Sequence, residues 1–157
     1  MNICRLPREE AFSLAYKMAE LNPGKEPFAR FADFENYYPR RMEADERLRS
    51  RFASLGGKPD EAHPLFFVLH GSGTLEKWFG DWISRRILLK DIPSECISFT
   101  LNDSLLSLGK EGKLTMYTKE ALSHKLREYD TIEEFLNELT KQYYCIEAQL
   151  WNDDYCV

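Results

Sequence analysis

Five consecutive apolar residues, Leu65 to Leu69, constrain the fold of this chain more than any other stretch. The run is too short for a buried helix, and it lies between Pro64 and the cluster Gly71-Ser72-Gly73. A short apolar run between turn residues is typical of a strand that is covered on both faces. We therefore expect residues 65–69 to form the central strand of a sheet.

The turn after this run combines flexible residues with hydrogen-bonding ones. Gly71 and Gly73 permit a tight turn, and Ser72 or Thr74 can cap a short helix over residues 75–79. A strand, a small-residue turn and a helix start can present backbone N–H groups to an anion. Gly71 and Ser72 are therefore candidate binding residues, with an ordinary strand-to-helix connection as the alternative.

Apolar residues at three- and four-residue spacing predict the main helices. They cover residues 8–21 and 39–55, with two further helices after the N-caps Thr118 and Asp130, the second with Glu133 completing a capping box. Residues 22–36 contain two prolines and three phenylalanines, so we expect them to lie across the core as a pinned segment.

Further strands are expected at residues 86–89, 96–101 and 144–151, with a possible edge strand at 114–117. In 96–101 the apolar residues alternate with Ser98 and Thr100, which predicts one buried face and one polar face. The fold class is therefore α+β: a single domain with a small mixed or antiparallel sheet covered by N-terminal and C-terminal helices. Residues 1–57 form its mainly helical part and residues 63–157 its sheet-containing part.

The net charge of -5 is concentrated in the second part of the chain, where residues 63–157 hold 15 Asp and Glu against 10 Lys and Arg. Nucleic acid is therefore an improbable partner. The sequence has neither a membrane-span pattern nor a secretion-signal pattern, so a cytoplasmic location is expected. Four isolated cysteines are expected to be reduced thiols, and neither a metal site nor a cofactor is predicted. They are Cys4, Cys96, Cys145 and Cys156.

Arginines and tryptophans provide further candidate binding residues. Arg40, Arg47 and Arg51 lie on one side of the helix expected at 39–55, where they either bind an anion or form a solvated face neutralised by Glu43, Asp45 and Glu46. Trp78 and Trp82 are four residues apart and either anchor a core edge or line a ligand pocket.

Polar residues at strand ends and on strand faces form one candidate catalytic set. His70 follows the first strand, Ser98 lies in the 96–101 strand and Glu147 lies in the last. This order, a His-Gly-Ser turn, a Ser-Phe-Thr strand and a strand glutamate, resembles the ADP-ribosyltransferase superfamily over residues 63–157. The resemblance implies that the three side chains converge on one cleft and clasp NAD, with Trp78 or Tyr117 stacking on the nicotinamide.

A binding or regulatory module is the competing interpretation, and the sequence favours it. The chain lacks a specific catalytic motif, its second part is acidic, and 13% of its residues are aromatic. Tyrosine and tryptophan are enriched at protein interfaces, and an acidic surface favours a basic partner. We therefore expect a partner protein to bind an acidic, aromatic-rich surface, and the NAD-binding enzyme is the alternative.

Overall fold

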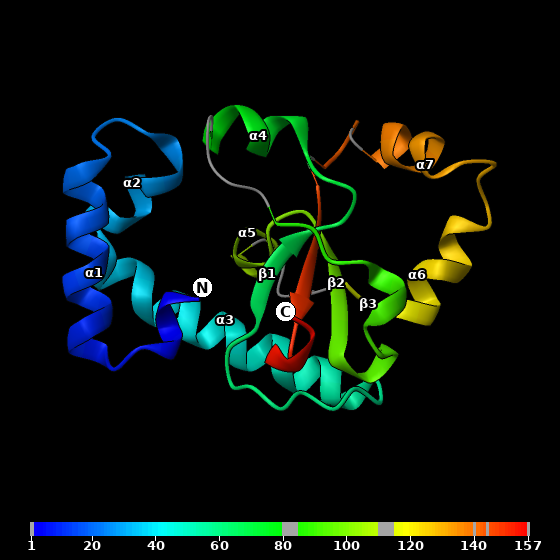
Figure 1. The fold of residues 1–157 in the computed structure, drawn as a ribbon, viewed down its shortest axis with the longest axis horizontal. Helices are drawn as coiled ribbons and strands as arrows, with labels where there is room; N and C mark the ends of the chain where they lie inside the picture. Colours follow the sequence, from blue (N-terminus) through cyan, green and yellow to red (C-terminus); the bar gives the residue numbers. More distant parts are fainter. Residues whose placement is uncertain (1, 80–84, 110–114, 140, 144, 157) are drawn as a thin grey trace.

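A four-stranded antiparallel sheet forms the centre of the computed structural model, which describes residues 2–79, 85–109, 115–139, 141–143 and 145–156 (Figure 1). Its strands are β1 (Leu65–Val68), β2 (Ile97–Leu101), β3 (Met116–Thr118) and β4 (Ile146–Leu150), in the order β1-β4-β2-β3. The predicted α+β class is confirmed. None of the helices in these ranges is long and apolar enough to cross a membrane.

The helices surround the sheet (Figure 1). The first part of the chain forms α1 (Arg8–Leu21), α2 (Glu26–Ala32) and the long α3 (Phe34–Ser54). The other helices are α4 (Gly73–Phe79), α5 (Ser104–Gly109), α6 (Lys119–Leu126) and α7 (Ile132–Leu139). Short 3-10 turns cover Ile3–Arg5, Leu89–Asp91, Ser94–Cys96 and Asp153–Tyr155.

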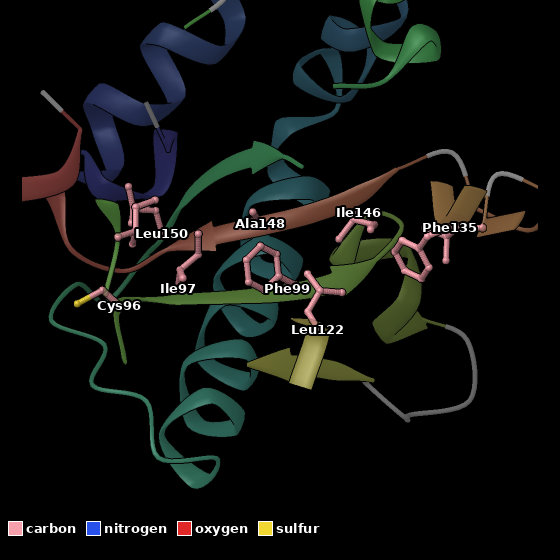
Figure 2. Close-up of a cluster of buried hydrophobic side chains, with 10 residues drawn as sticks. Cys96, Ile97, Phe99, Leu122, Phe135, Ile146, Ala148 and Leu150 are labelled. Carbon is pink, nitrogen blue, oxygen red and sulfur yellow. The ribbon is translucent and has the colours of Figure 1, made fainter. Parts of the chain in front are cut away.

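One face of the sheet is apolar and packs against α6 and α7. Figure 2 shows Ile97 and Phe99 of β2 beside the alternate residues of β4. Leu122 of α6 and Phe135 of α7 close this cluster, and both are almost completely buried. The helical spacing that predicted α6 and α7 therefore identified their core-facing sides correctly.

The opposite face packs against α3. Leu48 and Phe52 of α3 contact Met116 and Trp151, and the rings of Phe52 and Trp151 stack with centroids 6.0 Å apart. Ile146, Ala148 and Leu150 of β4 face the apolar core, whereas Trp151, which follows the strand, packs on the α3 side. Because helices cover both faces, the sheet has no fully solvated side within the described residues.

The expected central strand is an edge strand. β1 pairs only with β4 among the described strands, and each of its four residues is partly exposed. Its apolar residues nevertheless contact both cores, because Phe66 packs with the α3 cluster while Leu65 and Phe67 pack with the other. The continuous apolar run thus correctly indicated that both faces of the strand are packed against other residues. It did not indicate where the strand lies within the sheet.

Residues 86–89 are not a strand, which corrects a second prediction. Residues 85–88 have no regular secondary structure and lead into the 3-10 turn Leu89–Asp91. Ile87 and Leu89 still pack against the apolar core. Their apolar side chains are therefore buried in the core without the backbone pairing to a neighbouring strand. The fourth strand is instead β3 (Met116–Thr118), which overlaps the possible edge strand predicted at 114–117.

The pinned segment expected at 22–36 is largely helical, because α2 and the first residues of α3 together occupy most of it, and α3 begins at Phe34, before the predicted start at Pro39. The rings of Phe31, near the end of α2, and Phe34, at the start of α3, lie 5.9 Å apart. The N-cap of α7 is also one residue later than predicted. Glu134 N donates to Thr131 Oγ1 at 3.0 Å, so the capping residues are Thr131 and Glu134 instead of Asp130 and Glu133.

All four cysteines are free thiols, as predicted. Cys96 lies in a 3-10 turn and Cys145 directly precedes β4, so neither is inside a strand, although both are buried.

Gly57 lies against the ring of Phe52, and its replacement provides a test of this packing. A Cβ atom at Gly57 would lie 2.5 Å from the Phe52 Cε1 and Cζ atoms. Phe52 is completely buried against Trp151, so the ring has little room to move. We expect Gly57→Ala to lower the free energy of unfolding by about 1–3 kcal/mol in urea denaturation. Gly73→Ala is the control, because nothing lies within 4 Å of its added Cβ, and equal effects would contradict the clash.

Candidate functional site

A ladder of polar side chains crosses the sheet beneath α3. The register places Ser98 opposite Gln149 and Thr100 opposite Glu147. Gln149 Nε2 donates to Thr100 Oγ1 and to Glu147 Oε1, both at 2.9 Å. Ser98 Oγ donates to Gln149 Oε1 and accepts from Trp151 Nε1, again at 2.9 Å. These polar groups therefore satisfy one another within the protein.

The ladder is buried, which corrects the expectation that the polar side of the 96–101 strand is open. Ser98 and Gln149 are completely inaccessible to solvent, and Thr100 is 1% exposed. Alternation along the strand indicated two different faces, but α3 covers the polar one. Ser98 consequently has no direct access to a ligand from solvent.

Glu147 ends the ladder and has an unusual environment. The side chain keeps a part of its surface accessible, and Oε1 also accepts from Ser104 N at 3.4 Å. Burial, and to a lesser extent the nearby charge of Asp103, raises the pKa of Glu147 to about 7. The hydrogen bonds from Ser104 and Gln149 and the charge of Arg41 lower the pKa, but they do not outweigh burial. Glu147 can therefore exchange a proton near neutral pH.

A buried ionic cluster joins α3 to the N-terminal residues and to the segment before β1. Arg41 Nη2 lies 2.6 Å from Asp45 Oδ1, and both side chains are almost completely buried. Asp45 Oδ2 accepts from Asn2 Nδ2 at 3.0 Å and lies 2.9 Å from His63 Nδ1. The Arg41 guanidinium also stacks over the Phe66 ring, 4.7 Å from its centroid. These contacts hold three distant segments together and leave no open site among them.

A cavity of about 670 Å³ lies at the end of the sheet, between the turn after β1 and α7. Ligand pockets typically fall between about 300 and 1,000 Å³. Its polar wall comes from His70, Gly71, Ser72, Gly73, Thr74, Glu76 and Lys77. Its other wall comes from Leu136 and Leu139 of α7 together with Lys141, Gln142, Tyr143 and Cys145. The cavity therefore offers an apolar floor beside hydrogen-bonding groups.

Local backbone geometry opens the polar wall of this cavity. His70 and Gly71 have φ angles of 59° and 83°, which turn the chain sharply at the end of β1. Left-handed backbone is common for glycine and uncommon for histidine. Ser72 Oγ then accepts from Leu75 N at 3.4 Å, so Ser72 caps α4 as the sequence suggested.

The three predicted catalytic residues are not brought together. His70 lines the cavity, where its half-exposed ring lies 3.7 Å from Glu133 Oε1. Ser98 and Glu147 lie in the buried ladder and are not among the residues that line the cavity. The cleft that the ADP-ribosyltransferase resemblance implies is thus not formed by these three side chains.

The predicted binding residues have different surroundings. Gly71 and Ser72 line the cavity. Arg40 is exposed, and Arg47 forms an exposed ion pair with Glu43, as in the solvated-face alternative. Trp78 is 41% exposed on α4. Trp82 lies outside the described residues.

Sequence reasoning missed one entire wall of the cavity. The spacing of Leu136 and Leu139 indicated only that they belong to a core-facing side of a helix. Their distance in sequence from the turn after β1 hides the fact that they lie close to it in the fold. Gln149 was visible as a polar residue between apolar ones, and this alternation is the signal that could have identified the ladder. Within the described residues, no group of three His, Cys, Asp or Glu side chains is arranged to hold a metal ion.

The cavity, and not the buried ladder, offers room for a ligand among the described residues. Cys145 lines the cavity and directly precedes β4, two residues before Glu147. Burial raises the pKa of the Cys145 thiol to about 12, so this cysteine is not a nucleophile at neutral pH. Protein-family models, curated proteins and solved structures were all compared with this chain, and none matches it.

Proposed function

We propose that this protein is a binding module that receives a segment of a partner protein in the cavity between the turn after β1 and α7. The observation that carries the proposal is the cavity itself, with its apolar floor of Leu136 and Leu139. An apolar or aromatic side chain of the partner would fill this floor. Hydroxyl and amide groups of Ser72, Thr74 and Gln142 would bind the partner's backbone.

The charges around the cavity favour a basic segment. Glu133 Oε1 lies 3.7 Å from His70 Nε2, and Glu138 pairs with Lys141, so the lysine on this wall is already matched by an acid. Residues 128–139 contain five acidic residues and neither lysine nor arginine. We infer that a lysine or arginine next to the apolar anchor would be attracted to this acidic edge.

Site-specific photo-crosslinking tests where the partner binds. A photoreactive amino acid at Gln142, exposed on the cavity wall, is expected to capture a partner in the native cell, and the same residue at Glu20 of α1 is not. The captured protein is then purified and titrated against the wild-type chain. A clean monomer without a crosslinked partner would count against the proposal.

Blocking the cavity is expected to weaken binding of that partner at least tenfold. Gly73→Phe places a ring in the cavity mouth, where a Cβ meets nothing within 4 Å. Ser13→Phe, on the exposed side of α1, is the matched control and should bind normally. The charge reversal Glu133→Lys with Glu138→Lys should also weaken binding and reduce its salt dependence. Equal affinities for Gly73→Phe and Ser13→Phe would contradict the assignment, and calorimetry with NAD separately tests the enzyme alternative.

A further inference from the structure

An acidic side chain lies in the wall of the cavity itself. Glu76, in the first turn of α4, is among the residues that line the cavity, whereas Glu133 and Glu138 of the acidic edge are not. No other Asp or Glu belongs to the described part of this lining. Glu76 therefore provides the carboxylate that a ligand inside the cavity would meet.

Local structure sets the position of the Glu76 carboxylate. The backbone N–H of Glu76 donates to Ser72 O at 2.9 Å, which fixes this residue at the start of α4. Its Oε1 atom lies next to the turn after β1, because a Cβ atom added to Gly71 would be 3.4 Å from it. The side chain is exposed, so the carboxylate lies at the polar wall of the cavity and is open to solvent.

The Glu76 carboxylate has no cation beside it. Among the described residues it takes part in neither an ion pair nor a hydrogen bond, whereas Glu138 pairs with Lys141 at 2.6 Å. Lys77 follows Glu76 and also lines the cavity, but adjacent residues of a helix do not face each other. The negative charge of Glu76 is therefore available to a positively charged group that enters the cavity.

We propose that Glu76 selects the partner segment by forming an ion pair with a lysine or arginine next to the side chain that fills the cavity. This inference rests on the proposed function, because it names the residue that recognises the charge of that segment. The acidic edge attracts the segment, and Glu76 contacts its basic residue. Leu136 and Leu139 bind the apolar neighbour and can also pack against the aliphatic stem of the basic residue.

The size of the effect follows from the exposure of Glu76. Exposed ion pairs change an equilibrium constant by up to about fivefold. We therefore expect a preference of about threefold to fivefold for a lysine over an uncharged side chain of similar shape. Added salt should reduce this preference, because it screens exposed charges.

Two small probes test the selection without knowledge of the partner. One is N-acetyl-phenylalanyl-lysine amide, and the other is the same compound with its lysine side chain acetylated, which removes the charge. Each is titrated at millimolar concentration, and the NMR shifts of the Ser72, Thr74 and Gln142 amides report binding in the cavity. The preference for the charged probe should vanish in Glu76→Gln. It should persist in Glu9→Gln, the matched control at an exposed acid in the first turn of α1.

The outcomes separate this inference from the proposed function. If neither probe shifts the amides of the cavity, the cavity does not accept an apolar side chain and both proposals are wrong. If the two probes bind equally to the wild-type protein, Glu76 does not select the segment and the cavity remains a binding site. A preference that is lost in Glu133→Gln but retained in Glu76→Gln would likewise overturn the role of Glu76 alone.

Discussion

Replacing Asp45 with alanine is expected to lower the free energy of unfolding by about 3–5 kcal/mol, because it leaves a buried charge without its partner. Asp45 is completely buried, and its Oδ1 atom lies 2.6 Å from Arg41 Nη2. Its Oδ2 atom accepts from Asn2 and lies 2.9 Å from His63 Nδ1. Urea denaturation followed by circular dichroism provides the measurement.

Matched variants separate the buried charge from a general effect on α3. Glu43→Ala removes an exposed acid of the same helix and should change stability by less than about 0.5 kcal/mol. Arg41→Met combined with Asp45→Asn removes both charges and keeps an acceptor for Asn2, so it should recover most of the loss. A double variant as unstable as Asp45→Ala would contradict the role given to the buried arginine.

Truncating Trp151 to alanine is the second large effect expected, again about 3–5 kcal/mol of lost stability. The side chain is completely buried and packs with Leu48, Phe52 and Met116. Its loss would open a cavity between α3 and the sheet, because these neighbours belong to rigid elements. The truncation also removes the Nε1 donor that lies 2.9 Å from Ser98 Oγ.

Trp151→Phe divides this effect into its two parts. The phenyl ring restores most of the buried volume but not the hydrogen bond to Ser98, so a loss of about 1–2 kcal/mol is expected. Leu21→Ala, at a position that is 66% exposed, is the control and should be close to neutral. Thermal unfolding by calorimetry measures all three, and a loss below 1 kcal/mol for Trp151→Ala would show that α3 does not seal this face.

The sequence was most informative where a regular spacing of apolar residues matched the buried side of a single helix or strand. The apolar spacing of α6 and α7 predicted helices there, and the alternation of residues 96–101 predicted that Ile97 and Phe99 share one face. Thr118 was correctly assigned as a cap, since its hydroxyl accepts from Ala121 N at 3.2 Å. Local hydrogen bonds and repeats of 3.6 or 2 residues involve only residues that are close in sequence. They can therefore be predicted without knowledge of the fold.

Only one wall of the candidate site could be predicted, because only that wall is formed by residues that are close in sequence. His70, Gly71 and Ser72 were identified because the turn chemistry is local, and they do line the cavity. The opposite wall comes from Leu136 and Tyr143, more than sixty residues away, and nothing in their own surroundings distinguishes them from core residues. The contact of the buried Asp45 with His63 was hidden in the same way.

The apolar run Leu65 to Leu69 shows which structural properties follow from the sequence and which follow only from the tertiary structure. Its residues determined that a strand forms there and that both faces are covered, because burying apolar side chains stabilises the fold whatever lies beside them. Only the tertiary structure placed this strand at the edge and gave an interior position to β4, with its buried Gln149 and half-buried Glu147. Polar residues occupy a central strand when partners from β2 and α5 satisfy their hydrogen bonds, and that pairing exists only once the sheet has formed.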